Sequence, residues 1–440
     1  MALQVSRILH AGYVFSCDGV DIAFDPVFEN PFSRNCHAFP DVRFDHARIR
    51  ALIFAAVFFS HYLDDHCCFD SLDLLDRDTP IFMYCLFDEM FDMLRELGFS
   101  KVQQLRTNVP VAIGPFQVTP REALDADVDS MFQIRAAGMN VLNVVDSWIA
   151  PSVVTALAAD GPWDMVLWPF QTMREIAVLA PSLADQAAPE LPEEFIGQLR
   201  ELNPRFVVPS SCQFVQEPWS WYNHALFPIT YAQFQREVQA ALPDARVLRL
   251  NPSVSVMLDA DALTFADPLP WVAPVGEQDV DYDYRHDMAP PPTSEIARHF
   301  PALSESEAMR VLAWCHDGLL EKYRAMELPE GSYFEQPRLW RLSVYDHTGA
   351  AIDFHYRICG DTIEAAGSGT ASWLTEVPAA KIFAALERGE SLTSMYVRVS
   401  PGEGSADVVD DPLIRCLFND VFGGYQAAQL RRLKGVDEST

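Results

Sequence analysis

One uncharged run of nine residues, ALIFAAVFF at residues 51–59, places the strongest constraint on how this chain folds. Its three phenylalanines and its lack of polar side chains predict a β-strand that is covered on both faces. The run is followed at once by SHYLDDHCC, which holds two histidines and two aspartates between His61 and His66. Side chains in a loop after a buried strand commonly converge on a ligand. This junction is therefore the first candidate for a functional site.

The alternation of strands and polar loop residues continues along the chain. Residues 6–16 and 20–24 have the pattern of a hairpin around the turn signal Asp18-Gly19. Three further apolar runs each break at a loop, at residues 140–145, 163–169 and 205–209. Together with the helical stretches between them, these runs predict that residues 1–265 form a layered α/β or α+β domain. Its site is expected at the carboxyl ends of the strands.

The remaining residues differ in composition. We interpret residues 266–294 as a proline-rich acidic linker, in which DYDYRHD at residues 281–287 is solvated or, alternatively, forms a lid over the site. Residues 295–440 contain an amphipathic helix at 304–326, a hairpin around HTGA and a further helical stretch at 411–433. We expect this region to be a smaller α+β cap domain.

The charge balance limits the partners of the chain. Of its 440 residues, 62 are acidic and 32 are basic, which gives a formal net charge of -30. Such a field repels phosphate backbones and anionic lipid, so we expect a small-molecule substrate, with neither nucleic acid nor a membrane as partner. We find no membrane-spanning run and no signal-peptide pattern, and the nine cysteines lack paired spacing. These features predict a cytoplasmic protein with reduced thiols, and they are compatible with a homodimer.

Several motifs resemble the metallo-β-lactamase fold. The stretch SHYLDDHCC resembles its first metal motif, HxHxDH preceded by Ser or Thr, FDP at residues 24–26 resembles the end of its first strands, and VLNVVDS at 141–147 resembles the strand that ends in its bridging aspartate. Residues 129–149 and 377–399 are also similar to the lactonase-like branch that includes the metallo-β-lactamase portion of CMP-N-acetylneuraminate hydroxylase. The resemblance spans residues 5–265. It implies an αββα sandwich there, in an α+β chain with a smaller C-terminal domain.

The chain departs from this motif at one of the two metal positions. Leu63 stands where the motif has its second histidine, and the resemblance implies that it closes this position and leaves an apolar wall beside the other. A later histidine is expected within residues 120–130, but that stretch offers only carboxylates: Glu122, Asp125, Asp127 and Asp129. The distant histidine expected after residues 206–211 is also missing there, and His224 is the nearest one.

The resemblance therefore implies a remodelled, mononuclear site for one divalent metal ion, zinc or iron, with manganese as a further option. Three of the expected ligands survive, and three more side chains are candidates to complete the set. The survivors are Asp65, His66 and Asp146, and the further candidates are His61, Asp64 and His224. In the alternative interpretation, no metal binds, and these histidines and aspartates hydrogen-bond one another and cap the helix that follows. The sequence indicates no residues for any other cofactor.

Three functions fit these features. A metal-dependent hydrolase would use metal-bound water, with Asp64 or Asp65 as general base, to attack an ester, lactone or phosphoester. An iron-dependent oxygenase or oxidase is favoured by the likeness to the sialic-acid hydroxylase. Since the chain has no Rieske motif, electrons would then come from a separate redox partner or from the substrate. The third function is a catalytically silent binding protein. The sequence narrowly favours the hydrolase.

Overall fold

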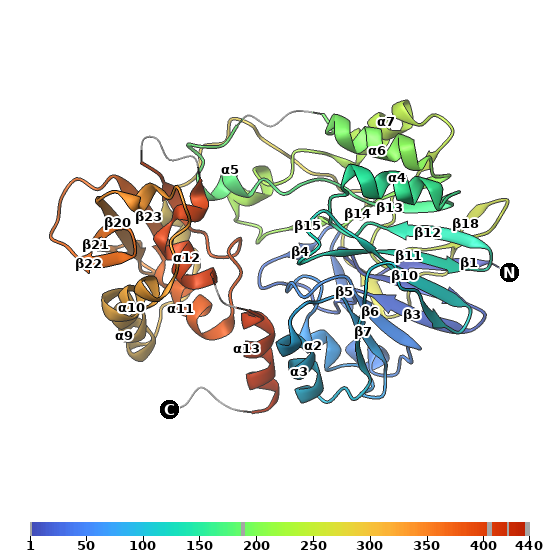
Figure 1. Cartoon of the computed structure of the whole chain (residues 1–440), viewed down its shortest axis with the longest axis horizontal. Helices are drawn as coiled ribbons and strands as arrows, with labels where there is room; N and C mark the ends of the chain where they lie inside the picture. Colours follow the sequence, from blue (N-terminus) through green and yellow to red (C-terminus); the bar gives the residue numbers. More distant parts are fainter. Residues whose placement is uncertain (1, 186–189, 403–406, 420–421, 436–440) are drawn as a thin grey trace. The chain divides into compact units, whose positions relative to one another are not determined.

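The chain forms two compact units in the computed structural model (Figure 1), which describes residues 2–185, 190–402, 407–419 and 422–435. Unit 1 consists of Met1–Met173, Ala188–Tyr284 and Gln429–Thr440, and unit 2 of Arg174–Ala187 and Arg285–Ala428. The later division along the chain, between residues 284 and 285, falls inside the stretch 266–294 that the sequence suggests is a linker.

Unit 1 contains an eight-stranded mixed sheet in the order β18-β17-β1-β2-β3-β6-β7-β8. Neighbours from β18 to β3 are antiparallel, whereas β3, β6, β7 and β8 run parallel. The strands are β1 (Leu3–Arg7), β2 (Tyr13–Cys17), β3 (Val20–Phe24), β6 (Ala56–Phe59), β7 (Ile81–Met83), β8 (Val102–Gln104), β17 (Ser255–Leu258) and β18 (Leu263–Ala266).

A seven-stranded sheet in the order β16-β14-β13-β12-β11-β10-β9 forms the second layer of unit 1. The half from β9 to β12 is antiparallel, and the half from β12 to β16 is parallel. The strands are β9 (Val111–Ile113), β10 (Phe116–Glu122), β11 (Ser130–Ala136), β12 (Met139–Asn143), β13 (Met165–Pro169), β14 (Phe206–Ser210) and β16 (Arg246–Val247).

The two sheets face each other across one apolar core. The ring of Phe132 in β11 lies 5.0 Å from that of Phe24 in β3 and 6.1 Å from that of Phe58 in β6, measured between centroids. All three side chains are completely buried. Helices α2 (Phe69–Leu72) and α3 (Asp88–Glu96) lie beside the first sheet, and α4 (Pro151–Ala159), α6 (Glu193–Leu202) and α7 (Tyr231–Ala241) lie beside the second (Figure 1). The αββα sandwich and the α+β class are therefore confirmed.

The strand expected at residues 51–59 is shorter in the structure. Only Ala56–Phe59 form β6, and all four residues are buried, as expected of a strand covered on both faces. The preceding residues connect α1 (His46–Ile49) to this strand, and the Ile53 side chain is 82% exposed. Since β6 is flanked by the parallel strands β3 and β7, its carboxyl end directs the following loop to the edge of the sheet at which those strands also end.

Unit 2 has a five-stranded sheet in the order β22-β21-β20-β23-β24. Its strands are β20 (Arg338–Tyr345), β21 (Ala351–Cys359), β22 (Thr362–Ala365), β23 (Trp373–Pro378) and β24 (Arg398–Ser400). Its α-helices are α5 (Glu175–Leu179), α8 (Thr293–Ile296), α9 (Glu305–Ala313), α10 (Leu319–Ala325), α11 (Ala379–Arg388) and α12 (Pro412–Phe418). The expected hairpin is formed by β20 and β21, and α9, a π-helical turn (Trp314–Gly318) and α10 together make up the expected helix.

The prediction of one continuous helix over residues 411–433 is wrong. Two separate helices, α12 and α13 (Gly424–Leu433), take its place, because α12 ends at Phe418 and the backbone of the next residue, Asn419, is extended.

The segment expected to be a linker takes part in the fold of unit 1 over its first half. β19 (Val272–Pro274) pairs with β5 (Val42–Phe44), and a second small sheet joins β15 (Phe214–Val215) to β4 (His37–Ala38). Tyr282 is buried, and its hydroxyl lies 3.0 Å from the carbonyl oxygen of Cys212 and 3.2 Å from that of Phe214. These contacts tie the acidic stretch to the loop after β14. None of the described helices is long and apolar enough to span a membrane.

Candidate metal centre

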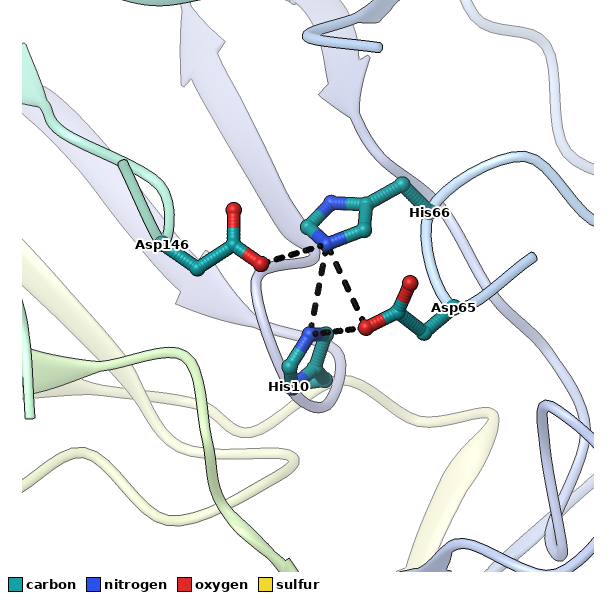
Figure 2. A group of neighbouring side chains, drawn as sticks. All are labelled: His10, Asp65, His66 and Asp146. Atoms are coloured by element: carbon teal, nitrogen blue, oxygen red, sulfur yellow. Dashed lines mark hydrogen bonds and ion pairs between the residues drawn. The ribbon is translucent and has the colours of Figure 1, made fainter. Parts of the chain in front are cut away.

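Four side chains of unit 1 point toward one another at the edge of the sandwich (Figure 2). They are His10, Asp65, His66 and Asp146, and their ligand atoms all lie within 4.8 Å of one another. His10 lies in the turn between β1 and β2, Asp65 and His66 in the loop after β6, and Asp146 in the loop after β12. The two carboxylates thus meet in space, as expected from their places at strand ends.

The distances in this cluster suit a single metal ion. Two metal–ligand bonds of about 2.1 Å at a tetrahedral angle place their ligand atoms about 3.4 Å apart. Here Nε2 of His66 lies 3.3 Å from Nε2 of His10, 3.5 Å from Oδ2 of Asp65 and 3.1 Å from Oδ2 of Asp146. Nε2 of His10 lies 3.1 Å from Oδ2 of Asp65. Two imidazoles and two carboxylates are a donor set used for zinc, iron and manganese.

A buried carboxylate behind the cluster orients His66. Asp25, in the FDP stretch after β3, accepts hydrogen bonds from the backbone N–H and the hydroxyl of Ser60, at 2.8 and 2.7 Å. Its Oδ2 lies 3.2 Å from Nδ1 of His66. When Nδ1 donates its proton to this carboxylate, the lone pair of Nε2 faces the cluster, which is the usual arrangement behind a metal-bound histidine.

His10 is the member of the cluster for which the sequence predicted no role. It has a left-handed backbone conformation, with φ 47°, in the tight turn between β1 and β2. The completely buried Arg7 side chain fixes this turn: its guanidinium donates hydrogen bonds to the carbonyl oxygens of His10 and Pro209, the latter at 3.0 Å. The imidazole lies against the rings of Phe32 and Phe214, with centroids 5.5 and 5.8 Å away. No sequence signal marks it: residues 6–16 were expected to form one strand of a hairpin, whereas the structure turns there between β1 and β2.

The charges of the cluster depend on one another. Burial lowers the pKa of His66, but Asp146 and Asp65 outweigh burial and hold that pKa well above its ordinary value. Burial raises the pKa of each of these two carboxyl groups, but His66, joined at Asp65 by His10, outweighs burial, so both pKa values lie below their ordinary range. Both carboxylates are therefore ionised at neutral pH and need a cation between them. A proton on His66 or a bound metal ion meets that need.

His61 lies beside the cluster but is not among its four members. Its side chain is 1% exposed, and its ring centroid is 3.9 Å from that of His66. Nδ1 lies 2.9 Å from the Ser60 hydroxyl and 3.7 Å from Oδ1 of Asp129. Nε2 is buried and has no hydrogen-bond partner in the described residues.

The other residues singled out from the sequence lie outside the four. Asp64 accepts a hydrogen bond of 2.6 Å from the Ser33 hydroxyl, and burial together with the Asp65 carboxylate raises its pKa to about 6. Nδ1 of His224 lies 2.8 Å from the carbonyl oxygen of Asp283. Leu63 does not form the expected apolar wall, because its side chain is 42% exposed.

Comparisons with known proteins give only structural likenesses. No protein-family model and no curated protein matches this chain. Similar solved structures include the metallo hydrolase Igni18 from Ignicoccus hospitalis, with 17% identity, 59% of this chain and 99% of that chain covered, and a TM-score of 0.42. The match to the diiron β-hydroxylase CmlA from Streptomyces venezuelae has 18% identity and a TM-score of 0.40, and it covers 58% of this chain and 53% of the CmlA chain. The metallo-β-lactamase fold protein YhfI from Bacillus subtilis has 13% identity, coverage of 58% and 99%, and a TM-score of 0.39. At such values the likenesses carry no argument about the site.

Proposed function

We propose that this chain, whose unit 1 is an αββα sandwich of the metallo-β-lactamase type, is a metal-dependent hydrolase with one divalent ion at His10, Asp65, His66 and Asp146. The observation that carries the proposal is the convergence of two imidazole nitrogens and two carboxylate oxygens within 4.8 Å. Asp25, behind His66, supports it by orienting the ring for a ligand on Nε2. His61, Asp64 and His224 have no direct ligand role in this proposal.

The bound ion, zinc or iron with manganese as a third option, would supply Lewis acidity: it lowers the pKa of water and polarises a carbonyl or phosphoryl oxygen. The chain's own contribution is to hold the donors in place. The two imidazole side chains are at most 2% exposed, while the Asp65 and Asp146 side chains are 23% and 24% exposed. A substrate would therefore approach from the side of the carboxylates.

Asp64 is the general base in this proposal. It directly precedes the ligand Asp65 in the loop after β6, and a carboxylate there can accept a proton from water bound at the centre. The hydrogen bond from Ser33 holds its carboxylate in place. Asp65 is better suited to be a ligand, because its pKa is depressed by His66. The proposed substrates are esters, lactones or phosphoesters of small molecules in the cytoplasm, where cysteine thiols stay reduced.

A second candidate function is an iron-dependent oxygenase with a separate redox partner. The observation in its favour is the donor set, since two histidines and a carboxylate are also the usual ligands of non-haem iron. A catalytically silent binding protein is the third candidate.

Metal analysis and a substrate panel test these candidates together. The protein is purified without chelator, its metals are quantified, and chromogenic ester, lactone and phosphodiester substrates are assayed after zinc, iron or manganese loading. Colourless protein with one zinc and hydrolysis of at least one substrate supports the hydrolase. Coloured, iron-loaded protein that hydrolyses none and consumes dioxygen with a reductant supports the oxygenase. Failure to bind any of the three metals overturns both.

A further inference from the structure

Exposed apolar side chains gather on three loops that follow β6, β7 and β10. Leu63 is 42% exposed, Leu86 51%, Phe87 41% and Leu124 60%. They account for four of the seven large apolar side chains that unit 1 exposes among its described residues; the other three are Ile53, Val109 and Phe265. Single exposed apolar residues are ordinary, but a group of them marks a binding surface. We call these four residues the apolar rim.

Contacts between the loops hold the rim together. The ring of Tyr62, which precedes Leu63, meets that of Phe87 edge-on with centroids 5.8 Å apart. The hydroxyl of Tyr84 donates a hydrogen bond to the carbonyl oxygen of Ala126, which ties the loop after β7 to the loop after β10. These contacts show that the three loops are neighbours in space.

The rim adjoins the candidate metal centre at two points. The backbone N–H of Leu124 donates to the carbonyl oxygen of Trp148 at 2.8 Å, two residues beyond the ligand Asp146. At the end of the same loop, Oδ1 of Asp129 lies 3.7 Å from Nδ1 of His61, whose ring packs on His66. A molecule at the centre would thus have the rim beside it.

Exposed carboxylates lie next to the rim residues on two of the three loops. Asp125 and Asp127 are exposed, and neither forms an ion pair with a lysine or arginine within the described part of the chain. Two further exposed carboxylates, Asp88 and Glu89, follow Phe87 directly. Burial raises the pKa of Tyr84, and Asp127, Glu122, Asp125 and Asp129 raise it further. The surface therefore combines apolar area with a negative potential.

We propose that the rim binds the non-reacting part of the substrate, and that this part carries an apolar group next to a protonated amine. This inference rests on the proposed function, because it takes the neighbouring cluster to be the reacting centre. The apolar group would remove the exposed leucine and phenylalanine surface from water. The ammonium would be attracted by the exposed aspartates, whereas a carboxylate or phosphate at the same place would be repelled.

Three probes that differ only in their polar end test the proposal. Phenylpropylammonium, phenylpropanol and phenylpropionate are titrated calorimetrically into the metal-loaded protein and into protein treated with chelator. We expect the ammonium to bind most tightly in both forms and its affinity to fall with added salt. The chelated form is needed because phenylpropionate could also ligate the metal. Its metal content is measured separately, so a failure of the proposed metal site is visible on its own.

Surface variants locate the binding site. Leu86→Ser and Leu124→Ser should each weaken binding of the ammonium by about fivefold, because each removes apolar contact area. Asp127→Asn should weaken it by about threefold, as expected for an exposed charge pair, and should reduce its salt dependence. The matched control is Phe265→Ser, which removes a side chain 64% exposed on the edge strand β18 and should leave binding unchanged.

Three results would overturn the proposal. The first is that no probe binds. The second is that phenylpropionate or phenylpropanol binds the chelator-treated protein as tightly as the ammonium probe does. The third is that Phe265→Ser weakens binding as much as Leu86→Ser and Leu124→Ser. In each case, a normal metal content would still support the proposed metal centre.

Discussion

His66 is the residue on which the candidate centre depends. Its Nδ1 lies 3.2 Å from Asp25, while its Nε2 lies within 3.5 Å of His10, Asp65 and Asp146. Three carboxylates thus surround a single imidazole, and this arrangement is stable only with a positive charge on or beside that ring. A proton and a metal ion compete for the same nitrogen, so metal binding at this site releases protons.

We expect His66→Ala, Asp146→Ala and His10→Ala to abolish stoichiometric metal binding, because each removes a direct ligand from a site with four. His224→Ala is the control: its imidazole is hydrogen-bonded to the Asp283 carbonyl oxygen, and the variant should keep its full metal load. Elemental analysis of the purified variants beside wild type measures the outcome. A full load in His66→Ala, or a loss in His224→Ala, would contradict the assigned ligand set.

Restoring the histidine of the resembled motif should not create a second metal site. Leu63 is 42% exposed, so a histidine there has solvent on one side, and residues 120–130 offer carboxylates but no imidazole. We therefore expect Leu63→His to bind one equivalent of metal, like wild type. The measurement is metal stoichiometry after zinc, iron or manganese loading. A second equivalent would mean that His61 and Asp129 complete a second position, and the mononuclear site would be wrong.

The sequence identifies those members of the cluster that follow a strand. Asp65, His66 and Asp146 could be named because the stretches that carry them resemble a known metal motif and each stretch follows a buried strand. His10 could not, because it reaches His66 from 56 positions away through a turn that Arg7 fixes with a contact to Pro209. The orientation of Leu63 likewise depends on its loop, and no local pattern encodes it.

At the scale of elements, the short helix α2 links the metal loop to the end of the chain. α2 begins three residues after His66, and Oε1 of Gln429 accepts a hydrogen bond of 2.7 Å from the backbone N–H of Phe69, the first residue of this helix. Nε2 of Gln429 lies 3.1 Å from Oδ2 of Asp70, which also pairs with Arg432. Residues from α13 therefore cap the helix and hold the loop that precedes it.

Removing this cap should weaken metal binding as well as stability. Gln429→Ala leaves the buried Phe69 N–H without its partner, which costs about 1–2 kcal/mol of unfolding free energy. Because the loop with Asp65 and His66 leads directly into α2, we also expect about tenfold weaker zinc binding, the effect typical of groups that orient ligands. Competition with a chromogenic chelator measures the affinity.

Gln239→Ala is the matched control for that prediction. Nε2 of Gln239 donates to the carbonyl oxygens at the end of α7, the shortest distance being 2.8 Å to Ala245. Its loss should cost similar stability without changing zinc affinity. Equal affinities in the two glutamine variants would refute the link between α13 and the metal loop.

Element boundaries followed the sequence where a local signal marks them. The helix that begins at Glu305 is preceded by Ser304, whose side chain and that of Glu307 form a capping box. The end of α12 carries no such signal: Asn419 is extended without a proline or glycine beside it, and so one helix was predicted across two. The strand at 51–59 was predicted too long, since an apolar run alone does not show that Ile53 faces solvent.

At the scale of the whole molecule, each unit has a core of its own. Unit 1 buries Phe24, Phe58 and Phe132 between its sheets, and unit 2 buries Trp340 and Leu342 in its central strand β20. All four proposed metal ligands belong to unit 1. A ligand that binds only the folded form stabilises the part of the chain that must be folded to bind it. Metal should therefore stabilise one unit selectively.

We expect calorimetric unfolding of the chelated protein to show two transitions, and zinc to raise only one of them. At a free zinc concentration about 100 times the dissociation constant, the gain is about 2.7 kcal/mol, which corresponds to a shift of about 5 °C for a unit of this size. Two variants assign the transitions: His66→Ala should remove the zinc shift, and Leu342→Ala, a large-to-small change at a fully buried position of unit 2, should lower the other transition alone. Equal zinc shifts in both transitions, or a zinc shift that persists in His66→Ala, would show that the metal does not bind where the four side chains of unit 1 converge.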